Sequence, residues 1–194
     1  AFITAAHRGQ NAPFHPRPLT PGIGRADVWV FDAAQPGGGI GGKPLGILTP
    51  FGDTLRPLAV SADGTRVYAG VFNSGNRTTA LEADIAGGGL AKPGPVTDAL
   101  GYAAPKTGLI VRHDGTHWVD NGDAENGQQP RIWDERVRFT LPDHDVFLID
   151  ALATPPRELQ RVSGVGTTLF NMAVNPKNGV LYVSNTEARN HVRF

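Results

Sequence analysis

The sequence predicts an all-β chain: an arc of four-stranded antiparallel β-propeller blades that forms an incomplete ring. Three observations predict this fold. A strand–turn–strand unit occurs twice, a different strand segment also occurs twice, and 25 glycines and 16 prolines in 194 residues suit a chain rich in turns. Short strands that recur as a four-stranded unit of about 40–45 residues have the spacing of propeller blades.

The clearest unit covers residues 56–76, where two apolar runs flank the dipeptide Asp63-Gly64. Asp-Gly between such runs is a strong hairpin signal, and a type I′ turn would place both of its central residues at positive φ. Residues 169–190 repeat the unit with Asn178-Gly179 at the turn. We therefore expect two equivalent hairpins, each made of the first and second strands of a blade.

Other strands of the unit recur elsewhere in the chain. The third-strand segment 27–33 matches 145–151 at four of seven positions, and 80–84 is a weaker copy. The second strand recurs at 2–7, and a degenerate hairpin lies at 109–119. Four units, some of them incomplete, are therefore expected.

These copies divide the chain, a single propeller segment of residues 1–194, into four parts. We assign a partial blade to 1–50, a blade to 51–107, a degenerate blade with an insertion to 108–163 and a partial blade to 164–194. Because the outer parts lack strands, we expect their apolar faces to pack against the remaining blades of the same propeller.

Two segments point to a known family. Phe2-Ile-Thr-Ala5 and Tyr182-Val-Ser-Asn185 resemble the Tyr-Val-Thr-Asn signature of the YVTN-type β-propeller repeat, and residues 60–68 are close to its consensus. The resemblance covers about half of the chain and departs at 9–26 and 85–140, which look like insertions. It implies a propeller fold and a periplasmic or extracellular bacterial protein, because such repeats occur in surface-layer and other exported proteins. Looser relatives are lactonases and propeller domains of periplasmic redox enzymes.

Composition excludes several classes of function. The net charge is zero and no basic stripe is present, which argues against nucleic acid as a partner. The absence of cysteine excludes a disulfide framework, a cysteine zinc site and a haem-attachment motif within these residues. No apolar run reaches the roughly 18 residues that a membrane span requires.

The inserted loops are the predicted binding surface. Loops between second and third strands leave a blade at the same end, and loops on a rigid scaffold often carry function. The insertions at 9–26 and 120–140 both have this position. The candidate binding residues on or beside them are His7, Arg8, Phe14, His15, Arg17, Arg131 and Trp133. Alternatively, the loops only fill space between blades.

Asp120, Asp123 and Glu125 form an acidic cluster in a loop that contains glycine. Hard cations such as calcium take carboxylate ligands, so these residues are the candidate metal site and calcium is the one candidate cofactor. Their spacing does not match an EF-hand, and a solvated acidic loop is the alternative interpretation. His113 and His117 flank an Asp-Gly turn, so their spacing does not form the zinc pair of a helix.

Asp32, Asp84 and Asp150 each end a copy of the third strand. A residue that recurs in every unit is expected to cap a turn, since a catalytic group is needed only once. No catalytic residue is assigned, because the sequence contains no nucleophile–base or paired-carboxylate signature. The predicted function is a non-catalytic β-propeller repeat module that binds a protein, a cell-surface partner or an extracellular polymer through its loops. The alternative is a propeller domain of a periplasmic redox enzyme, linked to a cytochrome or a quinone, or of a lactonase-type enzyme.

Overall fold

The computed structural model describes residues 1–5, 26–86, 97–103, 108–122, 127–137 and 143–187. All regular elements in these ranges are β-strands, which confirms the predicted all-β class. The chain forms two compact units: Ala1–Asn76 with Leu141–Glu187, and Arg77–Thr140 with Ala188–Phe194. Within the described ranges there is no helix long and apolar enough to cross a membrane.

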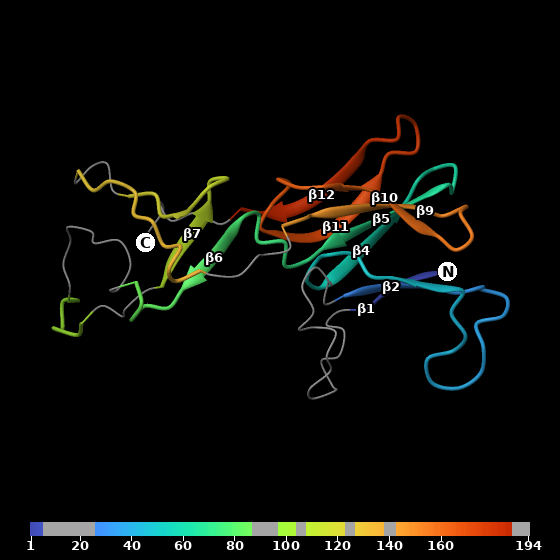
Figure 1. Ribbon diagram of the computed structural model, residues 1–194, viewed down its shortest axis with the longest axis horizontal. Coiled ribbons are helices and arrows are strands. Elements are labelled where there is room, and N and C mark those ends of the chain that lie inside the picture. The colour runs from blue at the N-terminus through green and yellow to red at the C-terminus, as the bar shows by residue number, and fades with distance from the viewer. Residues whose placement is uncertain (6–25, 87–96, 104–107, 123–126, 138–142, 188–194) are drawn as a thin grey trace. The chain divides into compact units, whose positions relative to one another are not determined.

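The first unit contains three antiparallel sheets (Figure 1). The first sheet has the order β1-β2-β3, with strands Phe2–Ala5, Asp27–Val30 and Gly46–Leu48. The central sheet has the order β4-β5-β9-β10, with strands Leu55–Val60, Arg66–Val71, Val146–Asp150 and Arg157–Val162. The third sheet pairs β11 with β12, strands Thr168–Val174 and Leu181–Thr186. None of these sheets closes into a ring.

The central sheet differs from the predicted unit in its third strand. The sequence analysis placed that strand at 80–84, after the second strand β5. In the structure β9 occupies this position, with Val67 opposite Ile149 and Tyr68 opposite Leu148. Residues 80–81 instead belong to strand β6, Thr78–Leu81, which pairs with β7. The strands of this sheet therefore lie on both sides of residue 107/108, and residues 77–140 come between its second and third strands in the chain.

Side-chain burial explains why β9 takes this place. Phe147 and Ile149 alternate along β9 and are fully buried. They join Val67, Ala69 and Val71 of β5 in one core cluster. Burying a side chain of the size of Phe or Ile is worth about 1.5–3 kcal/mol. The exposed Ala80 and half-buried Thr78 and Thr79 of β6 offer much less apolar surface.

Both faces of the central sheet have packed neighbours, and the second face is covered only in part. One face packs on the first sheet through Ala26 and Val28. The other face packs on β11 and β12, where Leu169 and Met172 join Val146 in a second buried cluster. A strand between two covered faces needs apolar side chains on both sides, which is why β5 and β9 are nearly continuous apolar runs.

The two hairpin turns are formed as predicted, but the turn type differs. Gly64 has φ 71° and Gly179 has φ 72°, which confirms their positive φ. Asp63 and Asn178 are not at positive φ, so the type I′ expectation is wrong. At the first turn the Asp63 carboxylate accepts hydrogen bonds from Ser61 Oγ (2.6 Å) and Thr65 N (3.0 Å), which stabilise a longer loop with glycine alone in the left-handed region.

The second unit has one small sheet of order β6-β7-β8, where β7 is Leu109–His113 and β8 is Trp118–Val119. An isolated bridge between Val119 and Ile132 brings a further segment beside β8. Its buried apolar side chains are Leu81, Ala86, Leu109, Val111, Trp118 and Val137. The loop that carries Arg131 and Trp133 is joined to this sheet by the bridge at Ile132.

Candidate functional site

Two of the predicted binding residues, Arg131 and Trp133, come together around a third predicted residue, Asp120. The Asp120 carboxylate is buried and accepts four hydrogen bonds. Oδ1 accepts from Gly122 N (2.9 Å) and Arg131 N (3.0 Å). Oδ2 accepts from Arg131 Nε (2.7 Å) and Trp133 Nε1 (3.0 Å). We call Asp120, Arg131 and Trp133 the Asp120 cluster.

The electrostatics of the Asp120 cluster favour an ionised carboxylate. Burial by itself would raise the pKa of Asp120, but the hydrogen bonds from Arg131, Trp133 and Gly122 outweigh it and lower the pKa. A charged acceptor makes these hydrogen bonds stronger than neutral ones. The carboxylate therefore fixes the orientation of both neighbouring side chains.

Arg131 is held on two sides. Its Nε faces Asp120, and its guanidinium carbon lies 4.8 Å from the centre of the Trp133 ring, which is cation–π distance. The Arg131 side chain is nevertheless 47% exposed, and the neighbouring Ile132 is exposed as well. The cluster thus presents an ordered arginine next to an exposed apolar side chain.

The predicted calcium ligands are not brought together within the described residues. Both carboxylate oxygens of Asp120 accept hydrogen bonds from N–H donors. Asp123 and Glu125 lie outside the described ranges. Across those ranges, no group of three His, Cys, Asp or Glu side chains has the geometry of a metal site. Calcium binding therefore stays a prediction. His7, Arg8, Phe14, His15 and Arg17 also lie outside the described residues.

His117 forms an ion pair that the sequence analysis missed. Its Nδ1 lies 2.6 Å from Asp134 Oδ2, and Asp134 Oδ1 accepts a hydrogen bond from Trp118 N (2.7 Å). The hydrogen bond to Asp134 raises the pKa of His117. His113 instead accepts from Gly115 N and packs edge-on against Trp118. The partner of His117 is 17 residues away, so no local spacing could reveal it.

The predicted turn caps can be checked at two of three positions. Asp32 Oδ1 accepts from Ala34 N (2.9 Å), and Asp150 Oδ1 accepts from Leu152 N (3.1 Å) and Ala153 N (3.2 Å). These are the expected caps. Asp145, the first residue of the same repeated segment, was not predicted to have a role. Asp145 is fully buried and accepts from Ser74 Oγ and from the backbone of Val165 and Gly166. Asp27 occupies the equivalent position in segment 27–33, and this repetition could have pointed to a structural role for Asp145.

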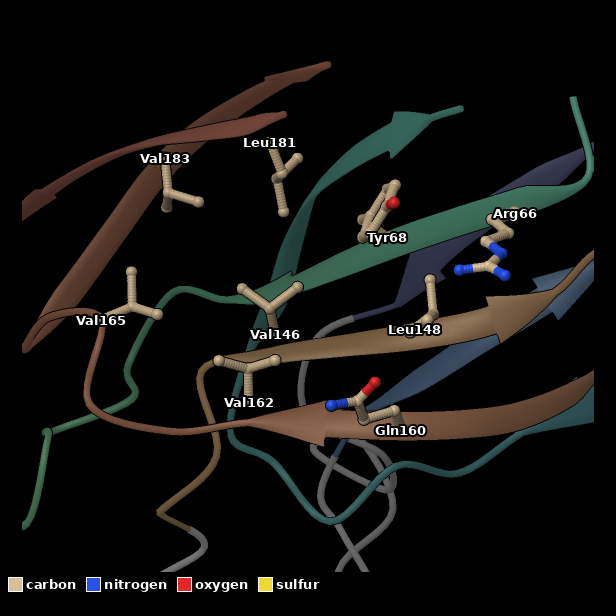
Figure 2. Close-up of a pocket in the computed structure, with 9 residues that line it drawn as sticks. All are labelled: Arg66, Tyr68, Val146, Leu148, Gln160, Val162, Val165, Leu181 and Val183. Carbon is tan, nitrogen blue, oxygen red and sulfur yellow. The ribbon is translucent and has the colours of Figure 1, made fainter. Parts of the chain in front are cut away.

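A cleft lies between the central sheet and β12 (Figure 2), with a volume of about 530 Å³. The central sheet contributes residues from β5, β9 and β10, and the other wall comes from β12 and the link before β11. The lining residues are Arg66, Tyr68, Val146, Leu148, Gln160, Val162, Val165, Leu181 and Val183. This cleft could not be predicted from local sequence, because its walls lie far apart in the chain.

Ser163 and His144 form a serine–histidine contact in the first unit. His144 Nδ1 lies 3.0 Å from Ser163 Oγ, but the hydroxyl donates its proton to the carbonyl of Asp143 (2.7 Å). Burial, and then the charge of Arg161, lower the pKa of His144. Ser163 therefore does not present its proton to the imidazole, and the contact does not have the geometry of an activated nucleophile.

Comparisons with protein-family models, curated proteins and solved structures find no match for this chain.

Proposed function

We propose that this chain has β-propeller-type repeats and serves as a non-catalytic binding module. The contact surface is the Asp120 cluster on the inserted second unit, and the partner is a protein or a polymer of the bacterial cell surface. The pre-ordered, half-exposed Arg131 beside Trp133 is the observation that carries this proposal.

The strand roles support the propeller part of the proposal. On this proposal, the three strands of the first sheet correspond to the second, third and fourth strands of a blade, and the four strands of the central sheet to a whole blade. The two strands of the third sheet correspond to the first and second. The outer side chains Ile3 and Ile47 of the first sheet are exposed, which suits a face that packs against a further blade.

The chemistry of the Asp120 cluster supports the binding part. Arginine and tryptophan are enriched among the residues that dominate binding energy, especially when their side chains are ordered before contact. Asp120 removes much of the ordering cost for Arg131 and Trp133. The terminal nitrogens of Arg131 suit a carboxylate, sulfate or carbonyl group on the partner.

The enzyme alternative has less support. In the described ranges the serine–histidine contact closest to catalytic geometry directs the serine proton to a backbone carbonyl. A redox or lactonase-type activity therefore stays a secondary prediction, without an observation that favours it.

The experiment that tests the proposal measures binding to isolated bacterial cell envelopes and to purified surface proteins and polysaccharides. Arg131→Ala is expected to weaken binding about tenfold, the effect of losing a central interface arginine. Arg136→Ala is the matched control, because Arg136 is exposed on the same segment but outside the cluster. Equal loss in both variants, or reproducible turnover of a lactone or a redox dye by the chain, would refute the proposal.

A further inference from the structure

We propose that the cleft between the central sheet and β12 binds a hydrocarbon chain with a single carboxylate, such as a medium-chain carboxylic acid. The carboxylate pairs with Arg66 and the hydrocarbon lies among the valines and leucines. This site is separate from the Asp120 cluster and does not depend on the function proposed for it.

The size and length of the cleft suit a small ligand. Its volume of about 530 Å³ lies within the range of roughly 300–1,000 Å³ that is usual for small-molecule sites. From the level of Arg66, which pairs with Asp150, to the level of Val146, which pairs with Gly70, the ladder advances four residues. At about 3.3 Å per residue this is roughly 13 Å, the scale of a medium-length hydrocarbon chain.

The inner part of the cleft is aliphatic. Its apolar lining residues are Val146, Leu148, Val162, Val165, Leu181 and Val183. Five of them are placed on three different strands, and the sixth, Val165, is fixed by the hydrogen bond from its backbone N–H to buried Asp145. A wall of branched aliphatic side chains favours a flexible hydrocarbon and offers no partner for a second charged group.

The polar groups gather toward one side. In Figure 2, Arg66, Tyr68 and Gln160 lie in the right half of the view together with Leu148, whereas the four valines and Leu181 lie in the left half. Arg66 carries the one charge among the lining residues. A ligand with its head group at this side and its tail at the other therefore matches both parts of the cleft.

Charge complementarity decides the head group. No carboxylate of a described residue lies within ion-pair distance of the Arg66 guanidinium. Asp150 is opposite Arg66 in the ladder, but Oδ1 accepts from two backbone N–H groups and Oδ2 lies 3.8 Å from Arg157. A guanidinium pairs with a carboxylate through two parallel hydrogen bonds, and the Tyr68 hydroxyl and the Gln160 amide can add further donors.

The experiment titrates octanoate, below its micelle concentration and at neutral pH, into the full chain while amide signals are followed by NMR. The expected shifts map to the cleft-lining segments of β5, β9, β10 and β12. 1-Octanol, which has the same tail without the charge, is expected to bind about tenfold more weakly, since a hydrogen bond between charged groups is lost.

Variants separate the head-group site from apolar adsorption. Arg66→Gln is expected to weaken octanoate about tenfold and leave octanol unchanged, whereas Val162→Gln weakens both ligands. Arg161→Gln is the control, because Arg161 is half-exposed on β10, pairs with Glu158 and does not line the cleft. Val162 and Arg66 are both exposed, so neither change should disturb the core, and circular dichroism checks this.

Three results would overturn the proposal. The first is equal affinity for octanoate and octanol in the native chain, which would mean apolar adsorption only. The second is shifts confined to residues away from the cleft, or none at all. The third is shifts of Leu148 and Val183 that follow protein concentration rather than octanoate, which would assign the cleft to a second copy of the chain.

Discussion

The Ser74 hydroxyl donates a hydrogen bond to the carboxylate of Asp145, although 71 residues separate them. Ser74 follows β5 and Asp145 precedes β9. Their hydrogen bond therefore joins the chain just before the inserted residues to the chain just after them. The second carboxylate oxygen accepts from Val165 and Gly166 in the link to β11. One buried side chain therefore joins three segments that are distant in sequence.

Replacing Asp145 should destabilise the first unit strongly. Asp145→Ala leaves one buried hydroxyl and two backbone N–H groups without their acceptor, and the expected loss is about 3–5 kcal/mol. Urea denaturation followed by circular dichroism measures it. The control is Asp32→Ala, which removes a turn cap at an exposed site and should cost about 1 kcal/mol or less. Similar losses in the two variants would contradict the role given to Asp145.

The turn glycines offer a test of backbone conformation without a packing effect. Gly64 has φ +71°, and a Cβ at this position would meet no atom within 4 Å. Gly64→Val should therefore cost about 1–2 kcal/mol through backbone strain alone. Gly64→Asn should cost less, because asparagine tolerates the left-handed region. Gly38→Val is the control, because Gly38 has open space and no positive φ. Thermal unfolding compares the three variants, and an unchanged Gly64→Val would exclude strain at the turn.

Two histidines of the described residues, His117 and His144, should have pKa values shifted in opposite directions. Asp134 raises the pKa of His117 above 6.5, whereas burial, and then Arg161, lower that of His144 below 6.5. NMR titration of the imidazole signals measures both values. The folded-state pKa of His117 exceeds its unfolded value, so its contribution to stability is complete below 6.5 and is lost as pH rises through the raised pKa. Asp134→Asn should return His117 toward 6.5 and leave His144 unchanged.

Asp120 should stabilise the fold of the second unit in addition to ordering the exposed Arg131 side chain. Asp120→Ala removes the acceptor of four N–H donors, and the expected loss of stability of this unit is about 2–4 kcal/mol. Hydrogen exchange measures it as faster exchange at Gly122 and Arg131, which donate to Asp120 from the backbone. Glu135→Ala is the control on the same segment, since Glu135 is exposed and outside the cluster. Unchanged exchange in Asp120→Ala would contradict a structural role.

Local sequence determined the class of the fold and most strand identities. The hairpins at Gly64 and Gly179, the strands β1 and β2 and the caps Asp32 and Asp150 were all predictable. Each depends on residues that are neighbours in the chain: a turn dipeptide, an alternation of side chains, or a carboxylate two residues before an N–H group. Such contacts form with little loop-closure cost, so the local pattern decides them.

Tertiary structure decided which strand completes the central sheet. Residues 80–84 and 145–151 carry versions of the same motif, and the first is nearer to β5 in the chain. The pairing goes to the distant copy because Phe147 and Ile149 bury fully against Val67 and Val71, whereas closing a longer loop costs only slightly more entropy than closing a short one. The same reason explains the candidate sites. Asp120 meets Trp133 and His117 meets Asp134 only after the following loop has folded back against β8, and Arg66 shares a cleft with Val183 only after two sheets of the first unit have packed. The burial that drives such packing depends on residues that are distant in the sequence.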